Sequence, residues 1–195
     1  RAAAPARELA HHQALLEVLL AEVRARRTRE LEQAVDDGRH ALEVAGAVRR
    51  RCPRCEFVHF RNPGVGAAVV IWDESERLLL VKRARSATRP GLWSIPAGYV
   101  DYGEEVRAAA ARELREETGL IAEVGDVVWV ASNFHDPAKL TVGIWFAGTV
   151  TGGALQAGDD ADAADFFATD ALPPMAFETD VAYLRSLGVD ARTAD

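Results

Sequence analysis

Hydrophobic positions recur at two different periods along the chain, and the change of period divides it near residue 50. From residue 7 to about residue 37, apolar residues repeat at helical spacing among alanine, glutamate and arginine, which favours a helix. These apolar positions are Leu9, Leu16, Leu19, Leu20, Val23, Leu31 and Val35. Asp36-Asp37-Gly38 marks a break, and a shorter helix is predicted from His40 to about Arg50. The pattern thus predicts an N-terminal helical arm over residues 1–50.

The predicted arm carries one apolar face that must be buried. Fifty residues of helix make too small a core to stand alone, so the face packs either on the rest of the chain or on a second copy. The sequence leaves both alternatives open, and a homodimer is the assembly that we expect.

After Pro63 the pattern changes to that of strands. Residues 65–72 and 77–81 flank the polar turn Asp73-Glu74-Ser75-Glu76, which predicts a β-hairpin. Further strands are predicted at 127–131 and 140–150, and helices at about 104–118 and 178–187. The stretch 157–165 is rich in alanine and aspartate. Strands on both sides of a strong helix predict an α+β domain, with a mixed β-sheet sandwiched between α-helices, over residues 64–195.

Composition is that of a globular protein. The chain has 195 residues, of which 49% are hydrophobic and 27% charged, with only 2 cysteines, and this excludes a disordered chain or a disulfide scaffold. Its apolar runs are only a few residues long, far below the roughly 20 that a membrane-spanning helix needs. No basic segment followed by an apolar run indicates a secretory signal. We therefore expect a cytoplasmic location and no membrane partner.

Charge is divided unevenly. Residues 1–51 carry 10 Lys and Arg against 8 Asp and Glu, whereas residues 52–195 carry 13 against 22. An acidic body of this kind repels a nucleic-acid polymer, because non-specific affinity comes mostly from cationic contacts to phosphate. We expect no nucleic-acid polymer as a partner, but small phosphates can still bind if divalent cations supply positive charge.

The predicted helix at 104–118 carries the candidate chemistry. Glu104-Glu105 places negative charge at its start, where the helix dipole favours it, and Gly119 is expected to end it in the left-handed conformation. On a helical wheel, Glu113 and Glu117 lie within about 20° of Val106, so these carboxylates continue the apolar stripe. A solvated charged face would lie opposite that stripe.

Three glutamates, Glu113, Glu116 and Glu117, crowd one side of the helix near its C-terminal end, where negative charge is unfavourable. Hard divalent cations are the natural compensation, because Mg²⁺ prefers oxygen ligands and keeps places for water and substrate phosphates. The pattern therefore predicts a magnesium site.

The spacing of glycine, charged and aliphatic residues over 98–120 resembles the sequence motif of the Nudix family. Its nine specified positions, G-x5-E-x7-R-E-U-x-E-E-x-G-U with U aliphatic, are matched by Gly98, Glu104, Arg112, Glu113, Leu114, Glu116, Glu117, Gly119 and Leu120. The resemblance covers about residues 52–187. It implies the Nudix fold and hydrolysis of a phosphoric anhydride bond in a nucleoside diphosphate linked to another moiety.

The resemblance also implies roles for individual residues. Glu113, Glu116 and Glu117 would bind Mg²⁺, with Mn²⁺ as a substitute, and the backbone carbonyl of Ala97 would add a ligand. Arg112 would orient these carboxylates, and Glu104 would support the loop and helix. The general base is either a glutamate of the motif or an acid in a later loop, for which Asp160 and Asp162 are the candidates.

Basic and aromatic residues near the motif are candidates for substrate contact: Arg83, Arg85, Arg89, Phe134 and His135. Arginine offers bidentate geometry to phosphate. Trp145 is expected in the core instead.

Residues 51–63 resemble half of a zinc ribbon. Cys52-Pro53-Arg54-Cys55 is followed by His59, but a closed zinc site needs four ligands, and no first cysteine pair is present. Zn²⁺ on Cys52 and Cys55, shared between subunits or completed by His59, and a remnant without metal both remain open, with the metal-free remnant favoured.

Three functions are compared. The first is a Mg²⁺-dependent pyrophosphohydrolase acting on ADP-ribose, a nucleotide sugar or a dinucleotide, and it is the one that we expect. The second is an enzyme that removes oxidised nucleoside triphosphates, and the third is a nucleotide-sensing module, which would predict a degraded motif.

Overall fold

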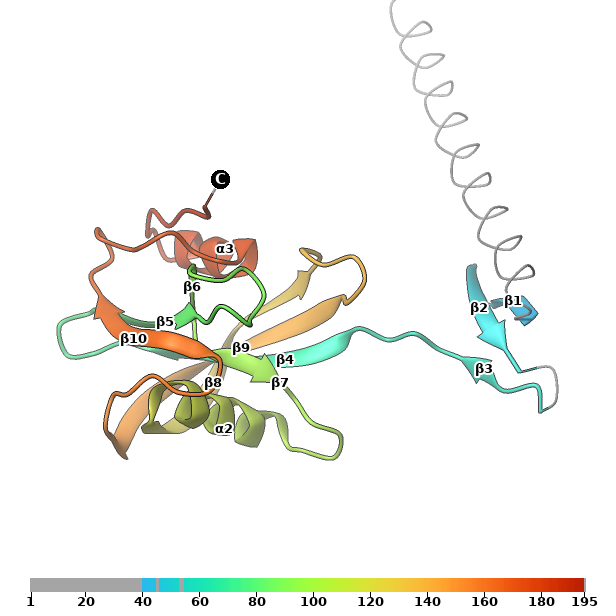
Figure 1. Cartoon of the computed structure of the whole chain (residues 1–195), viewed down its shortest axis with the longest axis horizontal. Helices are drawn as coiled ribbons and strands as arrows, with labels where there is room; N and C mark the ends of the chain where they lie inside the picture. The colour runs from blue at the N-terminus through green and yellow to red at the C-terminus, as the bar shows by residue number, and fades with distance from the viewer. Residues whose placement is uncertain (1–39, 45, 53–54, 195) are drawn as a thin grey trace, which may run out of the picture. The chain divides into compact units, whose positions relative to one another are not determined.

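The computed structural model describes residues 40–44, 46–52 and 55–194, so the predicted helix over residues 7–37 lies outside the described part. The chain divides into two units, Arg1–Asn62 and Pro63–Asp195. In the first unit, β1 (His40–Val44), β2 (Ala47–Arg51) and β3 (Val58–His59) form an antiparallel sheet in the order β1-β2-β3 (Figure 1).

The helix predicted from His40 to Arg50 is therefore wrong. Gly46 has a φ of +80°, a left-handed conformation that suits a tight turn, and Val44 pairs with Ala47 across it. Leu42 and Val44 recur at spacing two, so the apolar positions fit a strand as well as a helix. The turn glycine decides between the two.

The second unit contains two sheets. The larger has the order β7-β4-β9-β8 and is mixed, because β4 (Gly64–Ile71) runs parallel to β9 (Thr141–Gly153) and the other pairs are antiparallel. Its other strands are β7 (Ala97–Tyr99) and β8 (Leu120–Asn133). The smaller sheet, in the order β10-β5-β6, consists of β5 (Leu78–Arg83), β6 (Trp93–Ser94) and β10 (Ala161–Phe167).

Two helices, α2 (Val106–Thr118) and α3 (Glu178–Ser186), lie on opposite sides of these sheets (Figure 1). Alternate residues of β4 face two cores, because side chains of a strand point to its two faces in turn. Ala68 and Val70 pack in the core that contains α3, whereas Val69 and Ile71 pack in the core that contains α2. The predicted α+β class is confirmed.

The predicted hairpin forms only at its turn. Asp73 accepts hydrogen bonds from the backbone of Ser75 and Arg77, and Trp72 pairs with Leu78 in an isolated bridge. Beyond that point β4 and β5 enter different sheets. Both strands are buried on both faces, and each takes other strands as hydrogen-bonding neighbours.

The alanine- and aspartate-rich stretch contains the start of strand β10, which pairs with β5 and for which no strand was predicted. Its small residues have low strand propensity, so pairing with a buried neighbour decides its conformation. In the described part of the chain, no helix is long and apolar enough to cross a membrane.

Candidate active site

Helix α2 begins and ends as its sequence predicts. The carboxylate of Glu105 caps the start by accepting hydrogen bonds from the backbone of Arg107 and Ala108. At the other end, Gly119 has a φ of +70° and donates its N–H to the carbonyl of Arg115 at 2.9 Å. The helix is therefore fixed in register, and so are the acids along it.

The three glutamates of α2 lie at different depths. Glu117 is 1% exposed, Glu113 is half-buried, and Glu116 is exposed. One carboxylate oxygen of Glu117, Oε2, accepts the backbone N–H of Ala97 in β7 at 3.0 Å. The wheel argument that placed Glu117 on the apolar stripe is confirmed by this burial.

Arg112 gathers the acidic side chains around the outer part of this face. Its guanidinium contacts both oxygens of Glu104 at 2.9 Å and donates to the carbonyl of Tyr99 at 3.0 Å. A further nitrogen, Nη1, lies 2.7 Å from Glu113 Oε1 and 3.0 Å from Glu116 Oε2. One arginine thus fixes three carboxylates relative to the loop that precedes α2.

The pKa values divide these acids into two kinds. Hydrogen bonds from Arg112, and then from the backbone of Asp101, lower the pKa of Glu104 to about 2. Burial raises the pKa of Glu113 despite its contact with Arg112. Burial also raises the pKa of Glu117 well above its ordinary value, and the negative charges of Asp160 and Glu113 raise it further. In the metal-free protein the ionised forms of Glu113 and Glu117 are therefore disfavoured, mainly because both carboxylates are removed from water.

Gly98 allows the loop to approach this face. A Cβ at position 98 would lie 2.0 Å from the carboxyl carbon of Glu113, which is closer than any real contact. The glycine at the start of the motif is thus required by the space that the Glu113 carboxylate occupies.

The later acidic loop reaches the same site through one of its two predicted bases. Gly158 donates its N–H to the carbonyl of Glu117 at 3.1 Å, which holds the loop against the end of α2. Asp160 Oδ2 lies 3.5 Å from Arg83 Nη2. Asp162, by contrast, is exposed on β10. Sequence reasoning missed Asp159, whose charge also raises the pKa of Glu113.

Arg83 connects the acidic site to a pair of aromatic rings. Its Nε donates to the carbonyl of Thr88 at 2.8 Å, and its guanidinium carbon lies 5.4 Å from the ring centroid of Phe177. The ring centroids of Phe177 and His135 are 4.9 Å apart. Burial, and then the charge of Arg89, lower the pKa of His135, which favours its neutral form.

Two other residues predicted to contact the substrate are exposed: Phe134 is 69% exposed, and Arg85 is exposed as well. Phe177 was missed. It directly precedes α3, and nothing in its local sequence distinguishes it from a core aromatic.

Asp180, in the first turn of α3, is a further acid that sequence reasoning missed. It is 3% exposed, and its two oxygens accept the backbone N–H of Ile95 at 3.2 Å and the indole Nε1–H of Trp145 at 2.9 Å. Burial raises its pKa to about 7. Trp145 is 4% exposed, so its predicted place in the core is confirmed. Asp180 shares the buried face of α3 with Val181 and Leu184, and the wheel argument used for α2 would have found it.

The fit of a metal ion is judged from this donor set. Within residues 40–44, 46–52 and 55–194, no three His, Cys, Asp or Glu side chains converge closely enough to hold one. Glu113 and Glu116 both pair with Arg112, whereas Glu117 accepts the N–H of Ala97. The set nevertheless suits Mg²⁺, since it consists of carboxylate oxygens, and Mg²⁺ needs few protein ligands.

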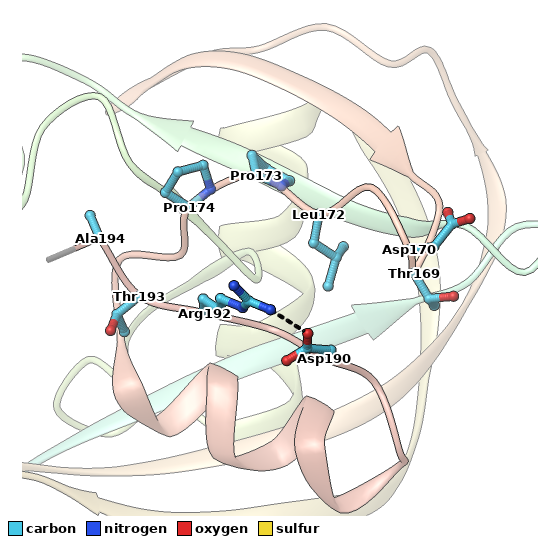
Figure 2. Close-up of a pocket in the computed structure, with 9 residues that line it drawn as sticks. All are labelled: Thr169, Asp170, Leu172, Pro173, Pro174, Asp190, Arg192, Thr193 and Ala194. Carbon is cyan, nitrogen blue, oxygen red and sulfur yellow. Dashed lines mark hydrogen bonds and ion pairs between the residues drawn. The ribbon is translucent and has the colours of Figure 1, made fainter.

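A groove of about 690 Å³ lies elsewhere, on the α3 side of the second unit (Figure 2). It is lined by the segment from Thr169 to Pro174 and the segment from Asp190 to Ala194, and Asp190 pairs with Arg192 at 2.7 Å. None of the predicted site residues lines it, and both members of the ion pair are largely exposed. The groove therefore does not coincide with the candidate active site.

Cys52 is partly buried and Cys55 is exposed. The N–H of Cys52 bonds to the carbonyl of Phe57, and its carbonyl accepts the N–H of Glu56. A zinc site on Cys52 and Cys55 stays a prediction.

Comparisons with known proteins place the chain in a family. The model of the NUDIX domain matches residues 62–187. An ADP-ribose pyrophosphatase of Methanocaldococcus jannaschii is 38% identical over 61% of this chain and 70% of its own length. The NAD-capped RNA hydrolase NudC of Pseudomonas aeruginosa is 31% identical over 68% of this chain, and the match spans only 46% of NudC.

A crystal structure of a NUDIX hydrolase from Nitrosomonas europaea superposes with a TM-score of 0.65 at 25% identity. The superposition covers 79% of this chain and 90% of that one.

Proposed function

The chain belongs to the NUDIX domain family, and on that premise we propose that it is a Mg²⁺-dependent pyrophosphohydrolase. Its substrate would be a nucleoside diphosphate linked to another moiety, with Mn²⁺ able to replace Mg²⁺. The observation that carries the proposal is the group of three glutamates on one face of α2. Arg112 holds Glu113 and Glu116 there, beside the buried Glu117.

Glu113, Glu116 and Glu117 would hold the metal, and the Ala97 carbonyl would add a backbone ligand. When bound, Mg²⁺ neutralises the diphosphate and lowers the pKa of a water molecule. Arg112 keeps the carboxylates of Glu113 and Glu116 in place, and the Ala97 N–H keeps that of Glu117 in place.

A carboxylate must take the proton from the attacking water as the phosphorus–oxygen bond forms. We assign this step to a glutamate of α2. Asp160 is the alternative, because its loop is bonded to the end of α2 and its side chain is 40% exposed, within reach of water.

Arg83 is assigned to the substrate phosphates, since its guanidinium lies between the acidic site and the Phe177–His135 pair. A planar base next to those rings would stack on them. The Methanocaldococcus relative, named as an ADP-ribose pyrophosphatase, supports ADP-ribose, a nucleotide sugar or a dinucleotide as the substrate.

A second candidate is the capped end of an RNA, because the Pseudomonas relative is named as an NAD-capped RNA hydrolase. The acidic charge of residues 52–195 argues against long contacts with RNA, so the absence of a nucleic-acid partner stays a prediction. The homodimer is also a proposal, which light scattering on the full chain would test.

Product analysis by ³¹P NMR separates the candidates. The full chain is incubated with Mg²⁺ or Mn²⁺ and with ADP-ribose, NADH, a nucleotide sugar, diadenosine polyphosphates, normal and oxidised dNTPs, or an NAD-capped oligonucleotide. We expect two monophosphates from ADP-ribose.

Preferential release of pyrophosphate from a dNTP would favour the alternative enzyme that removes oxidised nucleoside triphosphates. Binding without turnover would favour the sensing module, and turnover that persists in EDTA would contradict the proposal.

A further inference from the structure

The chain crosses from the smaller sheet to the larger one between β6, which ends at Ser94, and β7, which begins at Ala97. We call residues 95–97 the crossing segment. Pro96, in its middle, has no N–H, and its carbonyl accepts the N–H of Val69 at 3.1 Å. The remaining N–H groups of the segment, at Ile95 and Ala97, are donated to side-chain carboxylates.

These two carboxylates come from helices on opposite sides of the sheets (Figure 1). Asp180 of α3 accepts the N–H of Ile95 at 3.2 Å, and Glu117 of α2 accepts the N–H of Ala97 at 3.0 Å. Both acids are almost fully buried, with exposed fractions of 3% and 1%. The crossing segment is therefore held from both helices, and the proline restricts rotation between the two contacts.

We propose that Asp180 is a positioning residue for the α2 site: by holding Ile95, it keeps the Ala97 N–H aimed at the Glu117 carboxylate. The inference rests on the proposed role of Glu117 in hydrolysis. It gives α3, which contributes none of the three glutamates, a defined part in the geometry of the site.

The chemistry of Asp180 suits this role. Both donors facing it are neutral, and each uses a different carboxylate oxygen. An asparagine has one acceptor oxygen and one donor amide group, so it can satisfy only one of the two donors and opposes the other. The Trp145 contact is the shorter of the two, at 2.9 Å against 3.2 Å, so we expect the asparagine oxygen to stay with the indole and its amide group to face Ile95. Asp180→Asn should therefore disturb the crossing segment without changing the size of the side chain.

Trp145→Phe is the matched control. It removes the other hydrogen bond of Asp180 and leaves the Ile95 contact in place, and Trp145 belongs to the core rather than to the site. Two readouts are compared at a temperature well below the melting point of each variant. The first is the amide resonance of Ala97 in metal-free protein, by ¹⁵N–¹H NMR, and the second is the split between kcat and KM.

We expect Asp180→Asn to shift the Ala97 amide proton upfield and to lower kcat by about 10- to 100-fold, with KM nearly unchanged. Trp145→Phe should lower the melting temperature but leave the Ala97 resonance and kcat close to wild type. Equal effects of the two variants, or an unmoved Ala97 resonance in Asp180→Asn, would overturn the proposal.

The NMR readout needs no substrate, so a chain that hydrolyses nothing would overturn the proposed function while the positioning role is still tested. If Asp180→Asn does not fold, hydrogen exchange of the wild-type chain replaces it. The Ile95 and Ala97 amides should then exchange at similar slow rates. Exchange of Ala97 that is far faster than that of Ile95 would contradict a single anchored segment.

Discussion

Helices α2 and α3 each place an acid on a buried face, and the two acids face very different surroundings. Glu117 of α2 lies next to other carboxylates, and the negative charges of Asp160 and Glu113 add to the effect of burial on its pKa. Asp180 of α3 has only the neutral donors of Ile95 and Trp145 as hydrogen-bond partners.

The difference shows that a buried acid can have either of two roles. A carboxylate among other carboxylates has an unfavourable charge that a divalent cation can offset, which suits chemistry on phosphates. A carboxylate enclosed by neutral donors satisfies backbone and indole N–H groups, which suits the positioning of a segment. The predictions below test this contrast, in decreasing order of expected effect.

Glu117→Gln should lower metal-dependent kcat by about 10²- to 10⁴-fold, because it removes a charged metal ligand and a candidate proton acceptor. The amide oxygen of glutamine can still accept the Ala97 N–H, so the fold should survive. Turnover and the melting temperature are measured on the same preparation. Near-normal turnover by the folded variant would contradict the role of Glu117 in hydrolysis, and with it the contrast between Glu117 and Asp180.

Gly98→Ala should lower kcat by about 10-fold or more, since the added methyl displaces the Glu113 carboxylate. Gly152→Ala is the control, because a Cβ there meets nothing within 4 Å. Comparable kcat values for the two variants would show that the position of Glu113 is unimportant.

Phe177→Leu should raise KM by about 2- to 10-fold with little change in kcat, as the loss of one stacking contact would do. Phe134→Leu removes a predicted contact that is 69% exposed and should change KM less. A larger effect at Phe134 would support the sequence-based prediction that this residue contacts the substrate.

The stability of the metal-free protein should fall as pH rises from about 4 to 7. The pKa of Asp180 is raised in the folded state from 3.8 to about 7, so its contribution is present at low pH and is lost as the acid ionises. The loss is on the order of 4 kcal/mol, and the pKa of about 7 from which it follows already includes the lowering by Ile95, Trp145 and Arg83. Urea unfolding across this range should give a flatter curve for Asp180→Asn, and an unchanged slope would contradict the assignment.

The sequence predicted the fold class and the buried face of α2, but not several of the strand pairings. Glu117 was found because a helical wheel needs only local spacing, and Gly98 because its motif position is specific. The pairing of β5 with β10 depends on residues about 80 positions apart, which no local pattern contains. Strands β1 and β2 were missed because their hydrophobic pattern also fits a helix. Only the turn at Gly46, which reverses the direction of the chain, distinguishes the two. Phe177 could not be predicted as a site residue, because its contact with His135 joins two segments that are distant in the sequence.

The central claim is tested most directly by the hydrolysis of ADP-ribose by the full chain, followed by ³¹P NMR with Mg²⁺ and again with EDTA. The account predicts AMP and ribose 5-phosphate with Mg²⁺ and intact substrate with EDTA. Equal turnover in both samples would contradict a metal-dependent site on α2.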